Sequence, residues 1–154
     1  MANKITFNYS INNMFIWNSI NNIISTKKLL SKFANNLNKL RILYNNYIKE
    51  IQLVCPLKLF NKLFTDMIHI IHRTESIVNY LYYHKWDIKN MSNDVLLNFV
   101  SIISVYTKND TILLNNNLDK INKIKTINTT NITKITNKII KEFEKLKIKS
   151  DKLF

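Results

Sequence analysis

The sequence predicts an all-α protein, a bundle of four to five helices that carries a basic helical tail at its C-terminal end. Three observations lead to this prediction. Apolar residues recur at intervals of three and four over most of the chain, which places them on one side of a helix. Outside a Thr- and Ile-rich stretch at 126–136, no segment shows the alternation of a half-buried strand. Glycine is absent and proline occurs once among the 154 residues, so few positions break a helix.

The first half of the chain predicts three helices. Residues 11–24 have apolar side chains at roughly helical spacing, although asparagines interrupt them, and residues 27–53 carry one continuous apolar stripe. A helix over 57–84 follows Pro56, which is tolerated in a first helical turn. Two long stripes joined by a short link predict an antiparallel helical hairpin. The stripe residues are Leu30, Phe33, Leu37, Leu40, Tyr44, Tyr47 and Ile51, then Leu57, Phe60, Phe64, Met67, Ile71, Val78 and Leu81.

The next segment predicts a loop over 87–91 and a fourth helix over 93–107. The apolar residues of this helix cover a wide face, so we expect it to lie centrally in the bundle. The pair Asn109-Asp110 is typical of a turn, and we expect a further helix over 112–127.

The remaining residues change in character, because aromatic residues become rare and Lys and Ile dominate. The β-branched and polar stretch 126–131 predicts a break, and a terminal helix is expected over 131–149. We therefore expect two parts, a helical bundle over 1–109 and a Lys/Ile-rich helical extension over 110–154. The sequence leaves open whether the terminal helix packs on the bundle or projects from it. Its apolar stripe consists of Ile132, Ile135, Ile139, Phe143 and Leu146.

The charge is positive and unevenly distributed. The chain has 23 basic and 10 acidic residues, a formal net charge of +13. Residues 26–62 hold eight basic residues against one acidic, residues 63–107 three against four, and residues 108–154 eleven against five. Such a surface attracts polyanions and anionic membrane surfaces. Only Arg41 and Arg73 are arginines, so we expect contact with a nucleic-acid backbone and no base recognition.

The residues that we expect to contact nucleic acid come from the two most basic segments. Each is a cation that can lie beside a phosphate group. They are Lys27, Lys28, Lys32, Lys39, Arg41, Lys134, Lys138, Lys141 and Lys145.

The composition excludes several classes of enzyme. Without glycine the chain cannot form a phosphate-binding P-loop, a dinucleotide-binding fingerprint or a nucleophile elbow. One cysteine cannot build a disulfide framework or a Cys-rich zinc site. The apolar neighbours of Cys55 favour a buried structural thiol over a nucleophile. We expect no enzymatic activity, and no catalytic, cofactor-binding or metal-binding residue.

One segment has the residue types of a metal or acid–base site, because Asp66, His69, His72 and Glu75 are each three residues apart. Helical neighbours three apart can touch, but successive steps of three drift by about 60° around the helix, so the four side chains cannot converge. His69 also lies opposite the apolar stripe, where it is expected to face solvent or a partner. We favour a solvated polar face over a metal site.

A second cluster combines aromatic and basic residues at 80–86, at the end of the third expected helix. Such a cluster can stack an unpaired base. It can also close the end of a bundle while its polar tips stay in water. We favour the second interpretation.

The codon usage that the composition implies points to an AT-rich genome. Phe, Tyr, Met, Ile, Asn and Lys make up 90 residues, whereas Gly, Ala, Arg and Pro make up 5. This genetic argument favours an organelle, an endosymbiont, a large DNA virus or a cytoplasmic plasmid. No apolar run reaches 18 residues, so we expect no transmembrane helix. The N-terminal residues resemble neither a signal peptide nor an Arg-rich presequence, so we expect synthesis in the compartment where the protein acts.

Together these features predict a non-catalytic structural subunit of a large assembly. The favoured assembly is a mitochondrial ribosome, in which the organelle-encoded chain contacts rRNA through its lysines and contacts other protein subunits. The alternatives are an accessory subunit of a respiratory or ATP-synthase complex, with contact to a membrane surface, and a virus-encoded protein-interaction module in the infected cytoplasm.

Overall fold

A computed structural model describes residues 28–84 and 93–153 of the chain. Within these two ranges the chain forms four helices and no strand, which confirms the predicted all-α class. The helix expected at 11–24 and the loop expected at 87–91 lie outside the described residues. The helices are α3 (Lys28–Val54), α4 (Leu57–Tyr83), α6 (Asn93–Asn122) and α7 (Thr130–Asp151).

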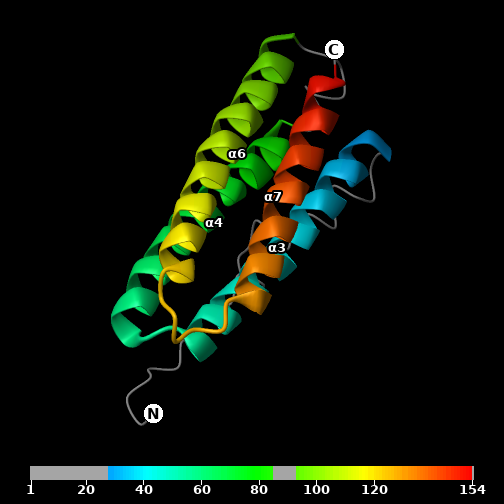
Figure 1. Cartoon of the computed structure of the whole chain (residues 1–154). Helices are drawn as coiled ribbons and strands as arrows, with labels where there is room; N and C mark the ends of the chain where they lie inside the picture. The colour runs from blue at the N-terminus through cyan, green and yellow to red at the C-terminus, as the bar shows by residue number, and fades with distance from the viewer. Residues whose placement is uncertain (1–27, 85–92, 154) are drawn as a thin grey trace.

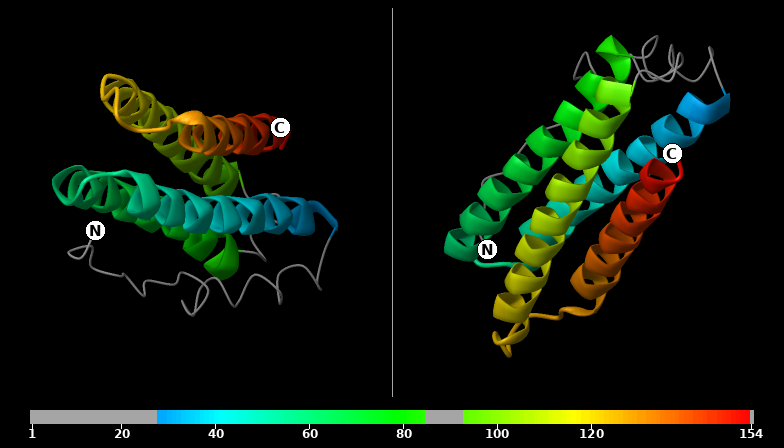
Figure 2. Two further views of the ribbon diagram at one scale, coloured as in Figure 1. Left: turned by 60° about the horizontal axis from the view of Figure 1, so that its bottom comes forward. Right: turned by 90° about the horizontal axis from the view of Figure 1, so that it is seen from above.

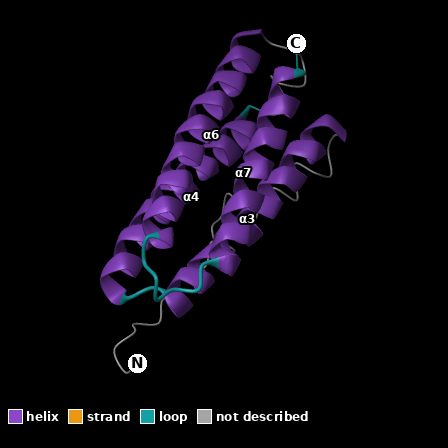
Figure 3. Ribbon diagram, in the orientation of Figure 1, coloured by secondary structure: helices purple, strands orange, loops and turns teal. Residues whose placement is uncertain are grey.

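The four helices form an up-and-down bundle (Figure 1). Helix α3 packs against α4 and α7, and α6 packs against the same two helices. Neighbouring helices run antiparallel, as short connections require. Figure 3 shows the connections α3–α4 and α6–α7 at the same end of the bundle. The contact between α3 and α7 closes the ring, so the first and the last described helix lie side by side (Figure 1).

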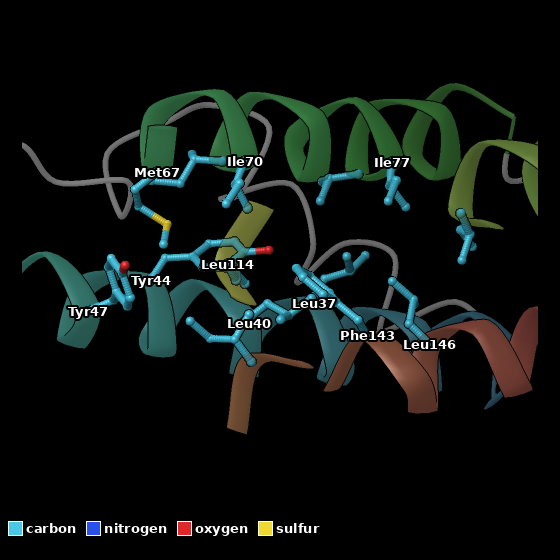
Figure 4. Packing of buried hydrophobic residues seen from close by; sticks show 14 of the residues in the cluster. Leu37, Leu40, Tyr44, Tyr47, Met67, Ile70, Ile77, Leu114, Phe143 and Leu146 are labelled. Carbon is cyan, nitrogen blue, oxygen red and sulfur yellow. The ribbon is translucent and has the colours of Figure 1, made fainter. Parts of the chain in front are cut away.

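Most residues of the predicted apolar stripes form the core, although Leu57 is exposed and Phe64 and Ile135 are half-buried. Leu37 and Leu40 of α3 are buried, as are Met67 and Ile71 of α4. Figure 4 shows α3 side chains pointing into the space between the helices toward Met67 and Ile70, with Leu114, Phe143 and Leu146 nearby. Each large apolar side chain that becomes fully buried contributes about 1.5–3 kcal/mol to folding. The apolar residues whose helical spacing predicted the helices therefore also stabilise the bundle.

Helix α6 continues through Asn109 and Asp110, so the expected turn there is wrong. The buried positions of α6 include Thr107, Asp110 and Asn117 at intervals of three and seven. The Thr107 hydroxyl donates to the carbonyl of Ile103 (2.7 Å), and Asp110 pairs with Arg73 of α4. The polar residues thus belong to the inward face of one long helix. The expected boundary between 1–109 and 110–154 falls inside it.

Helix α7 packs on the bundle, against α3 and α6. Ile132, Ile139, Phe143 and Leu146 are buried, as the apolar stripe predicts. The break expected at 126–131 is confirmed, because the connection from α6 ends where α7 begins at Thr130. None of the described helices is long and apolar enough to cross a membrane.

Candidate nucleic-acid interface

Helix α7 carries its predicted contact residues on one side. Lys134, Lys138, Lys141 and Lys145 are all exposed and follow one another at steps of four, three and four. At 100° per residue these steps keep the four lysines within about 60° of the helix circumference. The apolar stripe of the same helix faces the core. Because the two stripes alternate in one sequence, burial of the isoleucines fixes where the lysines point.

A buried polar contact holds α7 in register with α3. The Asn36 amide donates to the carbonyl oxygen of Glu142 (3.1 Å) and to its carboxylate Oε2 (2.8 Å). Lys149 donates from Nζ to Asn36 Oδ1 at 2.6 Å. Asn36 is 2% exposed, and an unpaired amide there would cost about 1–3 kcal/mol. Sliding of α7 along α3 is therefore disfavoured.

A groove of about 400 Å³ opens between the exposed edges of these two helices, and we call it the α3/α7 groove. It brings Lys39 of α3 together with three of the lysines of α7, although the sequence separates them by about one hundred residues. Its lining residues are Lys39, Ile42, Leu43, Lys138, Lys141, Glu142 and Lys145.

Most of the positive charge in the α3/α7 groove is not neutralised. Lys145 forms an ion pair with Glu142 (3.4 Å), and its side chain is 49% exposed. Within the described residues, no acidic side chain pairs with Lys39, Lys138 or Lys141. Surface ion pairs contribute little, so the pair with Glu142 also leaves Lys145 available for exchange. The groove can therefore bind an anionic group with at least three cations.

Two other predicted residues lie beside or away from this groove. Lys134 is exposed one turn before Lys138, on the same side of α7, but it does not line the groove. Arg41 follows Lys39 by two residues, which places it about 200° further around α3. Its Nε atom is buried and has no hydrogen-bond partner in the described part of the chain. Arg41 is therefore separated from the lysines that the groove brings together.

The remaining predicted contact residues cannot be placed. Lys27 and the side chains of Lys28 and Lys32 lie outside the described residues. Sequence reasoning also missed Asn36 and Glu142, because both are polar residues that occupy inward positions. Their spacing from the apolar stripes could have indicated an inward position. Asn36 precedes the stripe residue Leu40 by four positions, and Glu142 follows the stripe residue Ile135 by seven.

The candidate metal segment does not form a site. Among the described residues, no group of three or more His, Cys, Asp or Glu side chains lies close enough to hold an ion. Asp66 instead accepts hydrogen bonds from Lys62 Nζ (3.1 Å) and Asn117 Nδ2 (3.0 Å). His69 is exposed, as predicted. Cys55 is buried, as expected for a structural thiol.

The described part of the aromatic cluster has packing contacts. The centroid of the Tyr80 ring lies 4.3 Å from the centroid of the His84 ring and 6.0 Å from that of the Phe99 ring. Its hydroxyl donates to the carbonyl of Val95 (3.3 Å), which joins α4 to α6. This arrangement agrees with a closed bundle end. The rest of the cluster, at 85–86, lies outside the described residues.

A second groove, of about 360 Å³, lies between α6 and α7 and has fewer lysines in its lining than the α3/α7 groove. Its two lysines, Lys108 and Lys147, share the lining with Glu144 and with apolar and hydroxyl side chains. Its positive charge is therefore smaller than that of the α3/α7 groove. The lining residues are Ser104, Thr107, Lys108, Thr111, Ile112, Phe143, Glu144 and Lys147.

Comparison of the chain with protein-family models, with curated proteins and with solved structures gives no match.

Proposed function

We propose that this chain is a non-catalytic structural subunit of a large assembly and that its α3/α7 groove binds the phosphate backbone of RNA. The observation that carries the proposal is the convergence of Lys39, Lys138 and Lys141 from two helices on one groove, where no acid of the described ranges pairs with them. Like charges brought together in this way repel one another, and a polyanion would relieve that repulsion.

The chemistry of the groove favours backbone contact without base recognition. A lysine ammonium is a point charge that binds phosphate but lacks the fork geometry with which arginine reads guanine. The lysine stripe of α7 from Lys134 to Lys145 spans about 16 Å at 1.5 Å per residue, enough for several successive phosphates. If four lysines contact phosphates in this way, a rise in salt from 50 to 200 mM should weaken binding about 100-fold.

The assembly that we favour is a mitochondrial ribosome, with the chain encoded in the organelle. The AT-rich codon usage implied by the composition supports an organelle gene, and the lysine groove supports contact with rRNA. Purification of the native protein tests this directly. Ribosomal RNA and ribosomal proteins should accompany it. Recovery with a respiratory or ATP-synthase complex, or with viral proteins alone, would contradict the ribosomal assignment.

A second candidate, a subunit that acts through protein contacts alone, is favoured by the outer side of α6. Leu97, Val105 and Ile112 are each at least half exposed there, and steps of eight and seven keep them on one side of the helix. A chain that co-purifies with protein partners and has no affinity for RNA at low salt would fit this candidate.

The RNA proposal is tested by measuring the affinity for a structured RNA over a salt series. A groove variant combines Lys39→Gln, Lys138→Gln and Lys141→Gln. Loss of three phosphate contacts should lower the magnitude of the slope of log K against log[salt] by about 3. The affinity in low salt should fall at least about tenfold.

A matched control removes the same charge elsewhere, through Lys49→Gln, Lys108→Gln and Lys147→Gln. These three lysines are exposed and lie outside the α3/α7 groove. We expect the control to bind RNA with nearly the wild-type slope. Equal losses in the two variants would assign binding to overall charge, and no binding by the wild type would remove the proposal.

A further inference from the structure

A second group of lysines lies across the seam between α4 and α6. Lys62 of α4 donates from Nζ to Asp66 Oδ2 (3.1 Å) and to Asn117 Oδ1 of α6 (3.5 Å), so its ammonium reaches across the seam. Lys120 follows Asn117 by three residues and therefore lies on the same side of α6. Lys58, Lys62, Lys120 and Lys123 are all exposed, and we call them the α4/α6 patch.

The α4/α6 patch carries excess positive charge. Asp66 pairs with Lys62, and no other ion pair within the described residues involves a lysine of the patch. The neighbouring ammonium group of Lys62 lowers the pKa of Lys120. Two ammonium groups in such proximity repel each other, and a phosphate placed between them would reverse the sign of the interaction.

The two positive surfaces lie on opposite sides of the bundle. The helix ring runs α3, α4, α6, α7, so the α3–α7 and α4–α6 seams do not share a helix. Figure 2 shows this from above, with α4 and α6 on one side and α3 and α7 on the other. Two helix layers make the bundle about 20 Å thick between these sides. A straight nucleic-acid segment that contacts one side cannot contact the other.

We infer that this chain bridges two RNA segments, one in the α3/α7 groove and the other on the α4/α6 patch. The inference rests on the proposed function and adds to it the number and placement of the RNA segments. A bridge of this kind suits a structural subunit, because it holds two negatively charged segments about one bundle width apart and screens their repulsion.

The test uses the full chain and two short RNA duplexes, one labelled with an energy-transfer donor and the other with an acceptor. The wild type should bring donor and acceptor together, and sedimentation should give a complex of one chain with two duplexes. The double variant Lys120→Gln, Lys123→Gln should bind the second duplex at least about tenfold more weakly and lose energy transfer. Its first duplex should bind with nearly wild-type affinity.

The matched control, Lys108→Gln with Lys147→Gln, removes two charges from the other groove and should keep energy transfer. A wild-type chain that binds one duplex and depends on the α3/α7 groove would overturn the bridge while leaving the proposed function intact. Energy transfer that the Lys120→Gln, Lys123→Gln variant retains would also overturn it. A chain without any RNA affinity would overturn both.

Discussion

The interior of the bundle and the α3/α7 groove use charged residues in opposite ways. Inside, Arg73 donates from Nε to Asp110 Oδ1 at 2.6 Å, and the Asp110 side chain is 2% exposed. Beside them the hydroxyls of Tyr44 and Thr74 are 2.7 Å apart. We call these four residues the polar layer. In the groove, by contrast, Lys39, Lys138 and Lys141 have no acidic partner among the described residues.

The difference separates charges that maintain the fold from charges that are left for a partner. A buried charge must be paired, because desolvation of a lone ion costs several kcal/mol. An exposed lysine without an acidic partner costs the fold little stability, because water solvates its charge. A contribution to folding stability therefore does not explain why several lysines converge on the groove. The polar layer should therefore control unfolding, and the α3/α7 groove should control binding.

The largest effect on stability is expected at alkaline pH. Burial raises the pKa of both Tyr44 and Tyr47 far above the usual 10.0. Both phenols stay protonated in the folded state while they ionise in the unfolded state above pH 10. Stability is therefore fully present below pH 10 and falls above it, by about 2.7 kcal/mol per pH unit for the two groups. Urea unfolding at a series of pH values measures this slope.

The variant Tyr44→Phe, Tyr47→Phe has no such phenols and should show a shallower loss of stability above pH 10. Lysine deprotonation affects both proteins alike and cancels in the comparison. If the two proteins lost stability in parallel, the phenols of Tyr44 and Tyr47 would be accessible to solvent in the folded state, and the burial described for them would be wrong.

The next largest effect is expected from Asp110→Ala. Burial raises the pKa of the Asp110 carboxyl, and the hydrogen bond from Arg73 opposes this rise. Removal of the carboxylate leaves the Arg73 guanidinium unpaired. Because the Arg73 side chain is 30% exposed, we expect a loss of about 2 kcal/mol, below the range for a fully buried pair. Urea unfolding at neutral pH measures it.

The double variant Arg73→Met, Asp110→Leu is the control, because it removes both charges and fills the same space with apolar side chains of similar volume. It should recover most of the lost stability. If Asp110→Ala were as stable as the wild type, the polar layer would have no part in specifying the packing of α4 on α6.

The smallest effect on stability is expected from Glu142→Gln. Glu142 accepts a hydrogen bond from the buried Asn36 and also lines the α3/α7 groove. A glutamine keeps an oxygen that accepts from Asn36 and loses only the part-buried ion pair with Lys145, whose lysine is half exposed, so stability should fall by about 0.5 kcal/mol. The same change removes the negative charge of Glu142 from the lining of the α3/α7 groove and should tighten RNA binding several-fold. Unaltered or weaker RNA binding would show that the groove charge does not set affinity.

Apolar periodicity predicted most of the fold because burial follows helical spacing. The helices that the stripes predict, α3, α4 and α7, form with boundaries shifted by at most two residues, and most of the stripe residues are buried. The prediction failed in α6, where Asn109 and Asp110 are turn formers by local preference. The pairing of Asp110 with Arg73 overrides that preference, and such a long-range contact has no signal in a single sequence.

The site could be predicted in part. The lysines of α7 share a face that follows from their spacing, and the sequence reveals that spacing directly. That Lys39 joins them depends on the contact between α3 and α7, which closes the ring only in three dimensions. Arg41 shows the limit of charge counting, because its place around α3 separates it from the groove.

The most direct test of the division between the two regions is an NMR titration of the chain with structured RNA. We expect the largest backbone shifts at Lys39, Lys138, Lys141 and Lys145, and smaller shifts at the α4/α6 patch. Residues around Lys108 and Lys147, in the other groove, should change little. Shifts that are largest around Lys108 and Lys147, or that spread evenly over all exposed lysines, would contradict the account.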